Sequence, residues 1–194
     1  MDRFYIDQFF EQHCDDIHGC VLEIADNNYT KRFGVNRVLQ SEIFHVTESE
    51  KATLVGNLVS GQNVPTEAFD CIILTQTLPF IYDVDSAIAN CYRALKTNGV
   101  LLCTVNGISQ ISRYDMERWG DFWRFTNLSL AQLLKAHFKS STKNPEAVSI
   151  TTFGNVLTAT SLLFGIPSQE LQMKELNHHD QDYQVLIGAR AVKF

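Results

Sequence analysis

The chain has 194 residues, of which 45% are hydrophobic and 20% charged, and its formal net charge is −6. This length and composition predict an ordinary globular protein with one substantial core, forming a single domain over residues 1–194. The sequence is acidic overall and contains no run of basic residues. It therefore lacks the positive charge with which proteins bind nucleic acid or an anionic membrane surface.

The N-terminal stretch and the cysteines predict a cytoplasmic protein. Residues 1–16 contain acids and lack the basic region and apolar core of a signal peptide. No apolar run approaches the roughly 20 residues that span a bilayer. The five cysteines are widely spaced and contain no C-x-x-C pair. This pattern favours small buried thiols in a reducing compartment over metal ligands or nucleophiles.

Hydrophobic periodicity predicts an opening helix followed by buried strands. Apolar residues at helical spacing, stopped by Gly19, predict an amphipathic helix over residues 2–18 that acts as a lid or packs on the sheet. Apolar runs rich in Val, Ile and Leu predict strands covered on both faces, at residues 20–25, 52–58, 71–76 and 100–105. Between the last two lies a helix that Asp83 or Asp85 caps and Asn98–Gly99 ends, which predicts a parallel strand–helix–strand unit.

The remaining segments complete an α/β sheet. The first half has room for a short helix at 29–34 and a strand at 36–42, with a loop or single turn at 43–51. The last third predicts helices at about 129–139, opened by Ser129, and at 155–164, with strands at 147–153 and 183–194. The predicted fold is α/β, a single three-layer α/β/α sandwich with about seven strands, closed by a strand at the C-terminus.

Polar residues follow or interrupt several predicted strands. Glu23 lies inside the first strand, and Glu42 follows it by 19 residues at the predicted end of the next. Asn57 and Gln76 end the third and fourth. Ligands of open α/β sheets bind outside the carboxyl ends of the strands, and an acid about 20 residues past the first loop is the residue type that accepts hydrogen bonds from ribose hydroxyls. Each residue alone also fits a solvated strand end, but their order predicts a nucleotide site.

Three longer stretches share a family pattern. The first is VLEIADNNYT, residues 21–30. Its acid, Glu23, stands two residues before the positions at which the family pattern has alternating glycines. Residues 67–105 contain an FD entry to a strand and an R-x-L-K-x-x-G-x-L step into the next, and residues 121–126 read D-F-W-R-F-T. Together they resemble the class I S-adenosylmethionine-dependent methyltransferases, and more closely a small bacterial branch associated with glycosyltransferases and polysaccharide enzymes.

The resemblance implies a Rossmann-like methyltransferase fold, mostly parallel with an antiparallel C-terminal strand. Residues 1–19 would form an N-terminal helix, residues 20–105 the cofactor-side half and residues 106–194 the acceptor-side half. The implied cofactor is S-adenosyl-L-methionine, and methyl transfer by direct displacement requires in-line orientation and a base for a hydroxyl acceptor.

The resemblance also assigns roles by position. Glu23 would organise the first loop and the methionine amino end, and Glu42 would hold the ribose hydroxyls. Asn57, where many members have Asp, would bind the adenine amino group through its carbonyl oxygen. The adenine would also contact Leu58, and the fourth strand's tip, Thr75 and Gln76, would face the methionine part and the acceptor.

The first loop departs from the family pattern. Ala25, Asn27 and Tyr29 stand at the glycine positions, and Asp26 adds a side-chain acceptor. All four belong to the implied cofactor loop. The Tyr29 ring could stack against the cofactor, cover it or fill the cavity. If the ring swings outward, the loop can still hold a cofactor, and if it points inward, the site is closed. A substituted, acidic loop counts against a pyrophosphate group, so a dinucleotide-dependent dehydrogenase is disfavoured.

The segment after the fifth predicted strand is rich in aromatic and charged residues, which suit the apolar faces and hydroxyls of a sugar ring. The predicted acceptor-binding residues are Arg113, Tyr114, Trp119, Trp123 and Arg124. Two alternatives remain open. Trp119 and Trp123, four residues apart, would form one face of a short helix packed on the sheet, and Arg124 would pair with an acid and anchor the turn.

Asp115 is the first candidate for the general base, because it follows the fifth strand at the rim of the predicted cleft. His179, in the run His178–Asp180, is the second. Adjacent histidines on an extended chain point to opposite faces, so no metal site is predicted there, and an exposed loop before the last strand is the ordinary interpretation.

The leading hypothesis is therefore an S-adenosylmethionine-dependent methyltransferase that O-methylates a sugar or a related polar metabolite in glycan or polysaccharide biosynthesis. The alternative is a non-catalytic module with this fold, partnering a glycosyltransferase, whose loop has lost its affinity for the cofactor. The acceptor and the oligomeric state stay open at this stage.

Overall fold

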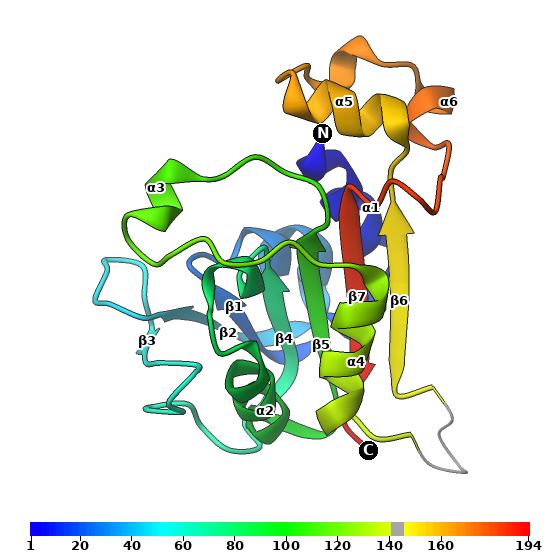
Figure 1. Cartoon of the computed structure of the whole chain (residues 1–194). Helices are drawn as coiled ribbons and strands as arrows, with labels where there is room; N and C mark the ends of the chain where they lie inside the picture. The colour runs from blue at the N-terminus through cyan, green and yellow to red at the C-terminus, as the bar shows by residue number, and fades with distance from the viewer. Residues whose placement is uncertain (141–145) are drawn as a thin grey trace.

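The computed structural model describes residues 1–140 and 146–194 and is built on a seven-stranded sheet (Figure 1). The strand order is β3-β2-β1-β4-β5-β7-β6, and β7 runs antiparallel to both of its neighbours while the other pairs are parallel. The strands are β1 Gly19–Ile24, β2 Val38–His45, β3 Leu54–Val55, β4 Phe69–Thr75, β5 Leu95–Asn106, β6 Val148–Phe153 and β7 Leu186–Val192. The predicted fold class is confirmed.

Helices cover both faces of the sheet. One face is covered by α1 (Asp2–Gln12), and the other by α2 (Val84–Ala94) and α4 (Asn127–His137) (Figure 1). The shorter helices α3 (Arg113–Met116), α5 (Val156–Leu163) and α6 (Met173–Leu176) lie beyond the carboxyl ends of the parallel strands. Single helical turns are η1 Cys14–Asp16, η2 Thr30–Gly34, η3 Val35–Arg37, η4 Leu78–Phe80 and η5 Ser168–Glu170.

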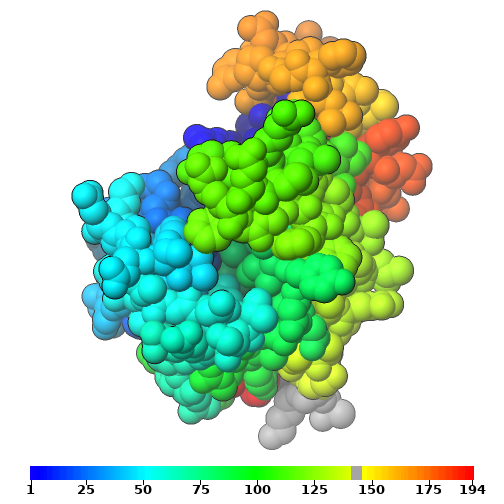
Figure 2. All heavy atoms as spheres, turned by 60° about the vertical axis from the view of Figure 1, so that its left-hand side comes forward, coloured from blue at the N-terminus to red at the C-terminus, as the bar shows by residue number. Residues whose placement is uncertain are grey.

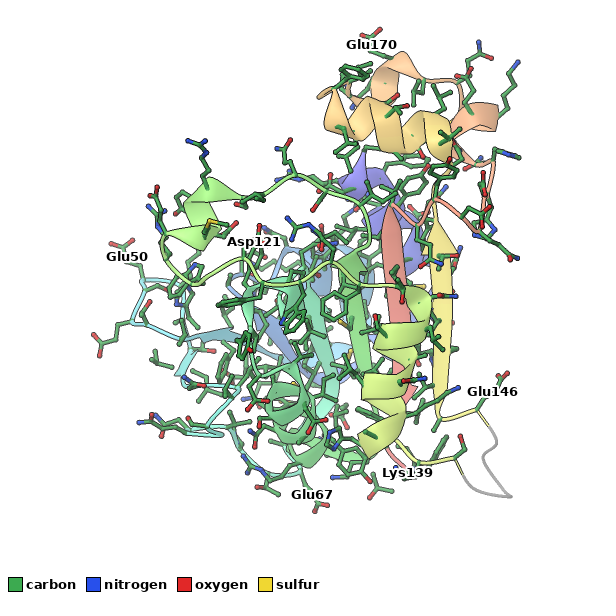
Figure 3. All side chains as sticks on the ribbon, in the orientation of Figure 1. Glu50, Glu67, Asp121, Lys139, Glu146 and Glu170 are labelled. Atoms are coloured by element: carbon green, nitrogen blue, oxygen red, sulfur yellow. The ribbon has the colours of Figure 1, made fainter. Side chains whose placement is uncertain are left out.

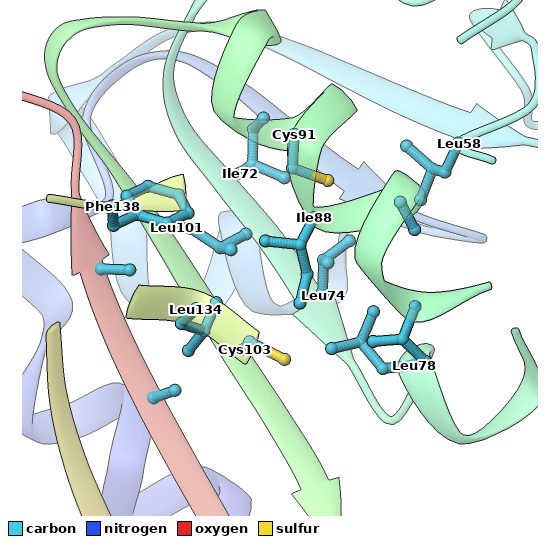
Figure 4. Close-up of a cluster of buried hydrophobic side chains, with 14 of the residues drawn as sticks. Leu58, Ile72, Leu74, Leu78, Ile88, Cys91, Leu101, Cys103, Leu134 and Phe138 are labelled. Carbon is cyan, nitrogen blue, oxygen red and sulfur yellow. The ribbon is translucent and has the colours of Figure 1, made fainter. Parts of the chain in front are cut away.

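The core explains why the central strands read as continuous apolar runs. Successive side chains of a strand point to opposite faces, so Ile72 and Leu74 of β4 pack in the cluster under α2, which Figure 4 shows. Their neighbours Cys71 and Ile73 pack on the other face, in the cluster that contains Phe9 of α1. With both faces covered, no position between Cys71 and Leu74 is left for a polar residue.

A glycine lets α1 approach the sheet. A Cβ atom on Gly188 of β7 would lie 2.3 Å from Cδ2 of Phe9, closer than two carbon atoms can approach. The absence of a side chain at this position therefore permits the Phe9 ring to pack directly on β7.

Cysteine burial follows the expectation for small apolar residues. Cys71, Cys91 and Cys103 are buried, Cys14 and Cys20 are half-buried, and all five are free thiols. Burial raises the pKa of the Cys91 thiol to about 12. Among the described residues no helix is long and apolar enough to cross a membrane.

Helix ends differ from their predicted positions for local reasons. The opening helix stops at Gln12 rather than residue 18, because His13 leaves the helical region with φ −118° and ψ 19°. Asp83, not Asp85, caps α2 by accepting a hydrogen bond from the Ser86 N–H. The same helix ends at Ala94 and not at Asn98–Gly99, since Leu95 is already extended and pairs with Phe69.

Helix α4 and strand β3 also have ends that differ from the predicted ones. Helix α4 begins at Asn127 because Thr126 is its cap, and Ser129 is the third residue of the helix, where it completes the capping box, and not the first. The third strand covers only Leu54–Val55 of the predicted 52–58. Asn57 ends it, because its carbonyl and side-chain oxygens accept hydrogen bonds from the backbone N–H groups of a turn over residues 59–61.

Candidate functional site

The loop after β1 is organised by a buried carboxylate. Glu23 is 1% exposed and accepts hydrogen bonds from the Tyr29 N–H (3.1 Å), the Thr30 N–H (2.8 Å) and the Thr30 hydroxyl (2.6 Å). Burial raises the pKa of Glu23, and the hydrogen bonds from Thr30 oppose that shift. Glu23 thus ties the end of β1 to the start of the next helical turn, the loop-organising role expected from the sequence.

The glycine positions of this loop are occupied in three different ways. Ala25 takes the left-handed conformation, with φ +69°, that a glycine would adopt without strain. The Asn27 amide donates to the Ser41 hydroxyl at 3.1 Å, which ties the loop to β2. Between them, Asp26 accepts hydrogen bonds from the backbone and side-chain amides of Asn28, at 3.0 and 2.7 Å.

Tyr29 does not enter the cleft. Its ring stacks on Phe10 of α1, with centroids 4.7 Å apart and planes inclined by 28°, and lies nearly parallel to Phe33. Burial against this aromatic group raises the pKa of the Tyr29 hydroxyl. The ring therefore takes the outward orientation, the one that lets the loop still hold a cofactor: it packs on the α1 face of the sheet, and the space above the strand ends stays open.

A cleft of about 640 Å³ lies at the carboxyl ends of the parallel strands. Its floor is formed by the ends of β1, β2 and β4 and by the turn after β3: Ile24, Ala25, His45, Val46, Asn57, Leu58, Val59, Thr75, Gln76 and Thr77. Its outer wall comes from the segments after β4 and β5: Phe80, Ile81, Tyr82, Asp83, Asp115, Arg118, Trp119 and Phe122. The segment 107–125 overhangs the loops after β2 and β3 in Figure 2.

Glu42 is the main correction to the sequence-based site. Strand β2 extends to His45, so Glu42 lies in its interior, paired with Leu22 of β1. The Glu42 carboxylate accepts hydrogen bonds from Thr53 and Gln40 and does not line the cleft. The predicted strand ended three residues too early, and the cleft meets the end of β2 at His45 and Val46 instead.

Asn57 lines the cleft, but not with the atom that was expected to bind adenine. Its side-chain oxygen accepts hydrogen bonds from the Val59 N–H (2.8 Å) and the Ser60 N–H (3.1 Å). Both lone-pair directions of that oxygen are thereby used. The side-chain amide nitrogen is the group of Asn57 that a ligand can still engage. Leu58, also predicted, is buried at the cleft floor.

Buried polar atoms without partners gather at the ends of β4 and β5. Among the described residues, four buried side-chain atoms have no hydrogen-bond partner: Thr75 Oγ1, Gln76 Nε2, Thr104 Oγ1 and Asn106 Oδ1. Thr75 and Thr104 are paired across β4 and β5, and Gln76 has a left-handed backbone with φ +48°. An unsatisfied buried polar group costs about 1–3 kcal/mol, so this concentration fits a place where a ligand supplies the missing partners.

The strap, residues 107–125, is fixed over the sheet by several bonds. The Asp121 carboxylate, 1% exposed, accepts hydrogen bonds from Arg124 at 2.6 and 3.0 Å and from the Ser112 N–H at 2.9 Å. The Arg124 guanidinium lowers the pKa of Asp121. Figure 3 shows Asp121 on the strap above the strand ends. Arg124 therefore has the structural role that the sequence left open, and it does not line the cleft.

The strap brings part of the predicted acceptor side to the cleft. Asp115 and Trp119 line it, and the Asp115 carboxylate accepts a hydrogen bond from the Ser112 hydroxyl at 2.6 Å. Trp123 lies beside it, since its indole N–H donates to the Ile81 carbonyl (3.0 Å) and its ring stacks on Tyr82. Helix α3 ends at Met116, so the two tryptophans do not form one helix face.

Other predicted residues lie elsewhere. Arg113 and Tyr114 are exposed in α3, away from the cleft lining. His179 accepts from or donates to the Thr152 hydroxyl at 2.8 Å, and with His178 it lines a second hollow between α1 and β6. His179 is therefore not positioned as the base of the main cleft. Within residues 1–140 and 146–194, no three His, Cys, Asp or Glu side chains are arranged to hold a metal ion.

The cleft also contains residues that sequence reasoning missed, notably His45, Tyr82 and Asp83. The run Ile43–Val46 contained the signal for His45, because its apolar residues continue the strand past Glu42. Asp83 lines the cleft, and hydrogen bonds from the hydroxyl and the backbone N–H of Ser86 lower the pKa of its carboxyl group.

Strand order, cleft position and the reversed seventh strand define the fold of class I methyltransferases. In agreement, residues 16–103 match the family model described as a methyltransferase domain, which spans less than half of the chain. No curated protein matches the chain.

Solved structures share the fold at low sequence identity. The phosphoethanolamine N-methyltransferase 2 of Haemonchus contortus, in complex with S-adenosylhomocysteine, aligns with a TM-score of 0.56 and 13% identity over 91% of this chain. This chain spans only 49% of that enzyme. An S-adenosylmethionine-dependent methyltransferase of Archaeoglobus fulgidus aligns over 98% of this chain and 90% of its own, with a TM-score of 0.56 and 12% identity.

A third similar structure is a complex. It contains the Trm112 methyltransferase activator of Haloferax volcanii and a methyltransferase, which aligns over 100% of this chain and 94% of its own. The TM-score is 0.55 and the identity 12%. At these identities the comparisons establish the fold, and the reaction has to be argued from the cleft.

Proposed function

We propose that the protein is an S-adenosylmethionine-dependent methyltransferase that methylates a hydroxyl group of a sugar or related polar metabolite, in cytoplasmic glycan or polysaccharide biosynthesis. The observation that carries the proposal is the set of unpartnered polar atoms at the ends of β4 and β5, two of which, on Thr75 and Gln76, belong to residues of the cleft floor. The methyltransferase-domain match and the fold support it, and the free cysteines fit a reducing compartment.

The residues present fit this cofactor. Thr75 Oγ1 and Gln76 Nε2 supply hydrogen-bonding groups at the end of β4, and the left-handed backbone at Ala25 reproduces the turn that a glycine would make after β1. The amide nitrogen of Asn57 and the side chain of Leu58 would border the adenine. The bound sulfonium supplies the electrophilic methyl group, and the protein's task is to orient it and exclude water.

The outer wall suits an acceptor with both apolar faces and hydroxyl groups. Tyr82 and Phe122 meet edge to face with centroids 5.4 Å apart, and Trp119 lies on the same wall. The Asp115 carboxylate already accepts a hydrogen bond from a hydroxyl group, that of Ser112. A sugar hydroxyl that displaces or joins Ser112 would be oriented and deprotonated by the same oxygen.

The test of the cofactor is a thermal-unfolding titration with S-adenosylhomocysteine, the product form. A ligand at about 100 times its dissociation constant stabilises the native state by about 2.7 kcal/mol, which raises the melting temperature measurably. Adenosine diphosphate is the control, because its phosphates require donors that this loop lacks. No shift at millimolar S-adenosylhomocysteine contradicts the proposal.

The test of the base uses labelled S-adenosylmethionine with a panel of free and nucleotide-linked sugars. Asp115→Asn keeps the shape and the bond to Ser112 but removes the proton acceptor. We expect methyl transfer to fall by 100-fold or more, on the order of a general base's contribution, with unchanged affinity for S-adenosylhomocysteine. Full activity of Asp115→Asn would remove this assignment.

One observation favours the alternative function, a binding module that partners a glycosyltransferase. In α5 the small residues Thr158, Ala159 and Ser161 are packed inward, whereas large apolar residues face outward. The outward set is Val156, Leu157 and Leu163, together with Phe164 directly after the helix. An exposed apolar surface of this kind is typical of a contact with another protein. A non-catalytic module should have no affinity for S-adenosylhomocysteine, so the thermal-unfolding titration with that ligand distinguishes the two functions.

A further inference from the structure

The carboxyl end of β2 presents a histidine to the cleft. The strand pairs with β1 up to its last residues, where the Ala25 N–H donates to the Phe44 carbonyl at 3.0 Å. His45 follows Phe44 and lines the cleft together with Ala25. In nucleotide sites of open α/β sheets, a carboxylate in this part of the second strand accepts hydrogen bonds from the ribose hydroxyls. Here the carboxylate of the second strand, Glu42, already accepts hydrogen bonds from Thr53 and Gln40.

The hydrogen-bond pattern fixes the tautomer of His45. The Thr47 backbone N–H, which can only donate, points at Nδ1 of His45 at a distance of 3.1 Å. Nδ1 is therefore the acceptor, and the proton of the neutral ring is on Nε2. The Thr47 hydroxyl lies at the same distance from Nδ1. Trp119 of the strap meets the imidazole edge to face, with centroids 6.0 Å apart, so the ring is held from both sides.

We propose that Nε2–H of His45 donates a hydrogen bond to a ribose hydroxyl oxygen of the adenosyl group, in place of an accepting carboxylate. The inference rests on the proposed function, since it names a contact of the same cofactor. Nε2 has no hydrogen-bond partner in the part of the chain that the structure describes. The cleft's own carboxylates, Asp83 and Asp115, come from the opposite wall. The polarity of the ribose contact is thus reversed: the protein donates and the sugar accepts.

The contact can be measured as affinity for S-adenosylhomocysteine by calorimetry. His45→Phe keeps a ring against Trp119 but removes the donor, and we expect about fivefold to tenfold weaker binding, the usual loss for one neutral hydrogen bond. His45→Gln restores an N–H donor and should recover most of the affinity. Glu42→Gln is the matched control on the same strand and should bind like the wild type.

A ligand analogue distinguishes loss of the hydrogen bond between His45 and the ribose from loss of the imidazole ring itself. The wild type should prefer S-adenosylhomocysteine over its 2′,3′-dideoxyribose analogue, and His45→Phe should lose most of that preference, because the two changes remove the same hydrogen bond. Nitrogen-15 spectra of the imidazole should show the Nε2–H tautomer in the free protein. Dominance of the Nδ1–H tautomer, or equal discrimination by both proteins, overturns the inference.

The outcomes also distinguish this inference from the proposed function. If the wild type does not bind S-adenosylhomocysteine, the proposed function itself is wrong. If the wild type and His45→Phe bind it equally well, only the ribose contact is wrong. If Glu42→Gln weakens binding and His45→Phe does not, the carboxylate on β2 holds the ribose after all.

Discussion

Ala25 shows how one side chain can keep a loop shape that is usually built with glycine. Its φ of +69° is in the left-handed region, where the methyl group crowds the following carbonyl oxygen. For an L-residue this costs roughly 1–2 kcal/mol. The loop keeps that conformation because Glu23 and the pairing of the Ala25 N–H with Phe44 fix the chain on both sides.

Replacing Ala25 with glycine should therefore stabilise the protein. The relief of left-handed strain exceeds the added entropy of an unfolded glycine, about 0.5–1 kcal/mol, so we expect the free energy of unfolding to rise by about 0.5–1 kcal/mol. Urea denaturation measures the change. Ala52→Gly is the control, since Ala52 does not have a positive φ, and it should lose stability. Loss of stability in Ala25→Gly as well would show that the strain is absent.

Residue identity alone could not reveal where Tyr29 points. The pattern of the first loop placed it at a glycine position, and from there the ring had several directions open. The deciding partner is Phe10, which lies in a different element and reaches Tyr29 only after α1 has packed on the sheet. Sequence therefore located the loop, and tertiary packing determined that its largest side chain leaves the cleft open.

At the scale of elements, strand length decided which residues reach the cleft. All seven strands were predicted, four of them from continuous apolar runs, the pattern of strands that are buried on both faces. Their ends were less predictable. Three additional residues in β2 moved Glu42 inside the strand and placed His45 at the cleft. Boundaries of this kind depend on pairing with β1, which no local pattern contains.

Glu23, whose hydrogen bonds connect β1 to the following helical turn, should make the stability of the protein depend on pH. Burial raises the pKa of Glu23, so the folded state binds its proton more tightly than the unfolded chain does. The stability from this group is fully present below its ordinary pKa of 4.5 and is lost as the pH rises through the higher folded value. Glu23→Gln removes this dependence and leaves a constant offset from the lost carboxylate bonds.

We therefore expect the stability of the wild type, relative to Glu23→Gln, to fall as the pH rises above 4.5. Urea denaturation at several pH values up to neutrality measures the difference. Asp121, whose pKa the Arg124 guanidinium lowers, contributes in the opposite sense and only at lower pH, as the pH falls through its folded value. A constant difference between the two proteins across this range would contradict the prediction.

At the scale of the whole molecule, the sequence predicted the layers of helices and strands more completely than it predicted the path of the strap. The α/β alternation and right-handed crossovers lead to this sheet and its helices, since few topologies satisfy both. The strap depends on long-range bonds, such as Trp123 to the Ile81 carbonyl and Phe122 to the Pro79 carbonyl. The aromatic composition of residues 113–124 indicated a site, but these bonds select Trp119 and Phe122 to line it.

Two apolar residues far apart in the fold should differ sharply in their contribution to stability. Leu134 of α4 is fully buried in the cluster of Figure 4, whereas Phe164, after α5, is 82% exposed. We expect Leu134→Ala to lower the free energy of unfolding by about 2–5 kcal/mol, because it leaves a cavity in a packed core. Phe164→Ala should change it by less than about 0.5 kcal/mol, since the ring is largely exposed to solvent. Urea denaturation of both variants, at the same protein concentration, checks the contrast. A loss in Phe164→Ala comparable with that in Leu134→Ala would mean that the outward face of α5 is covered in solution.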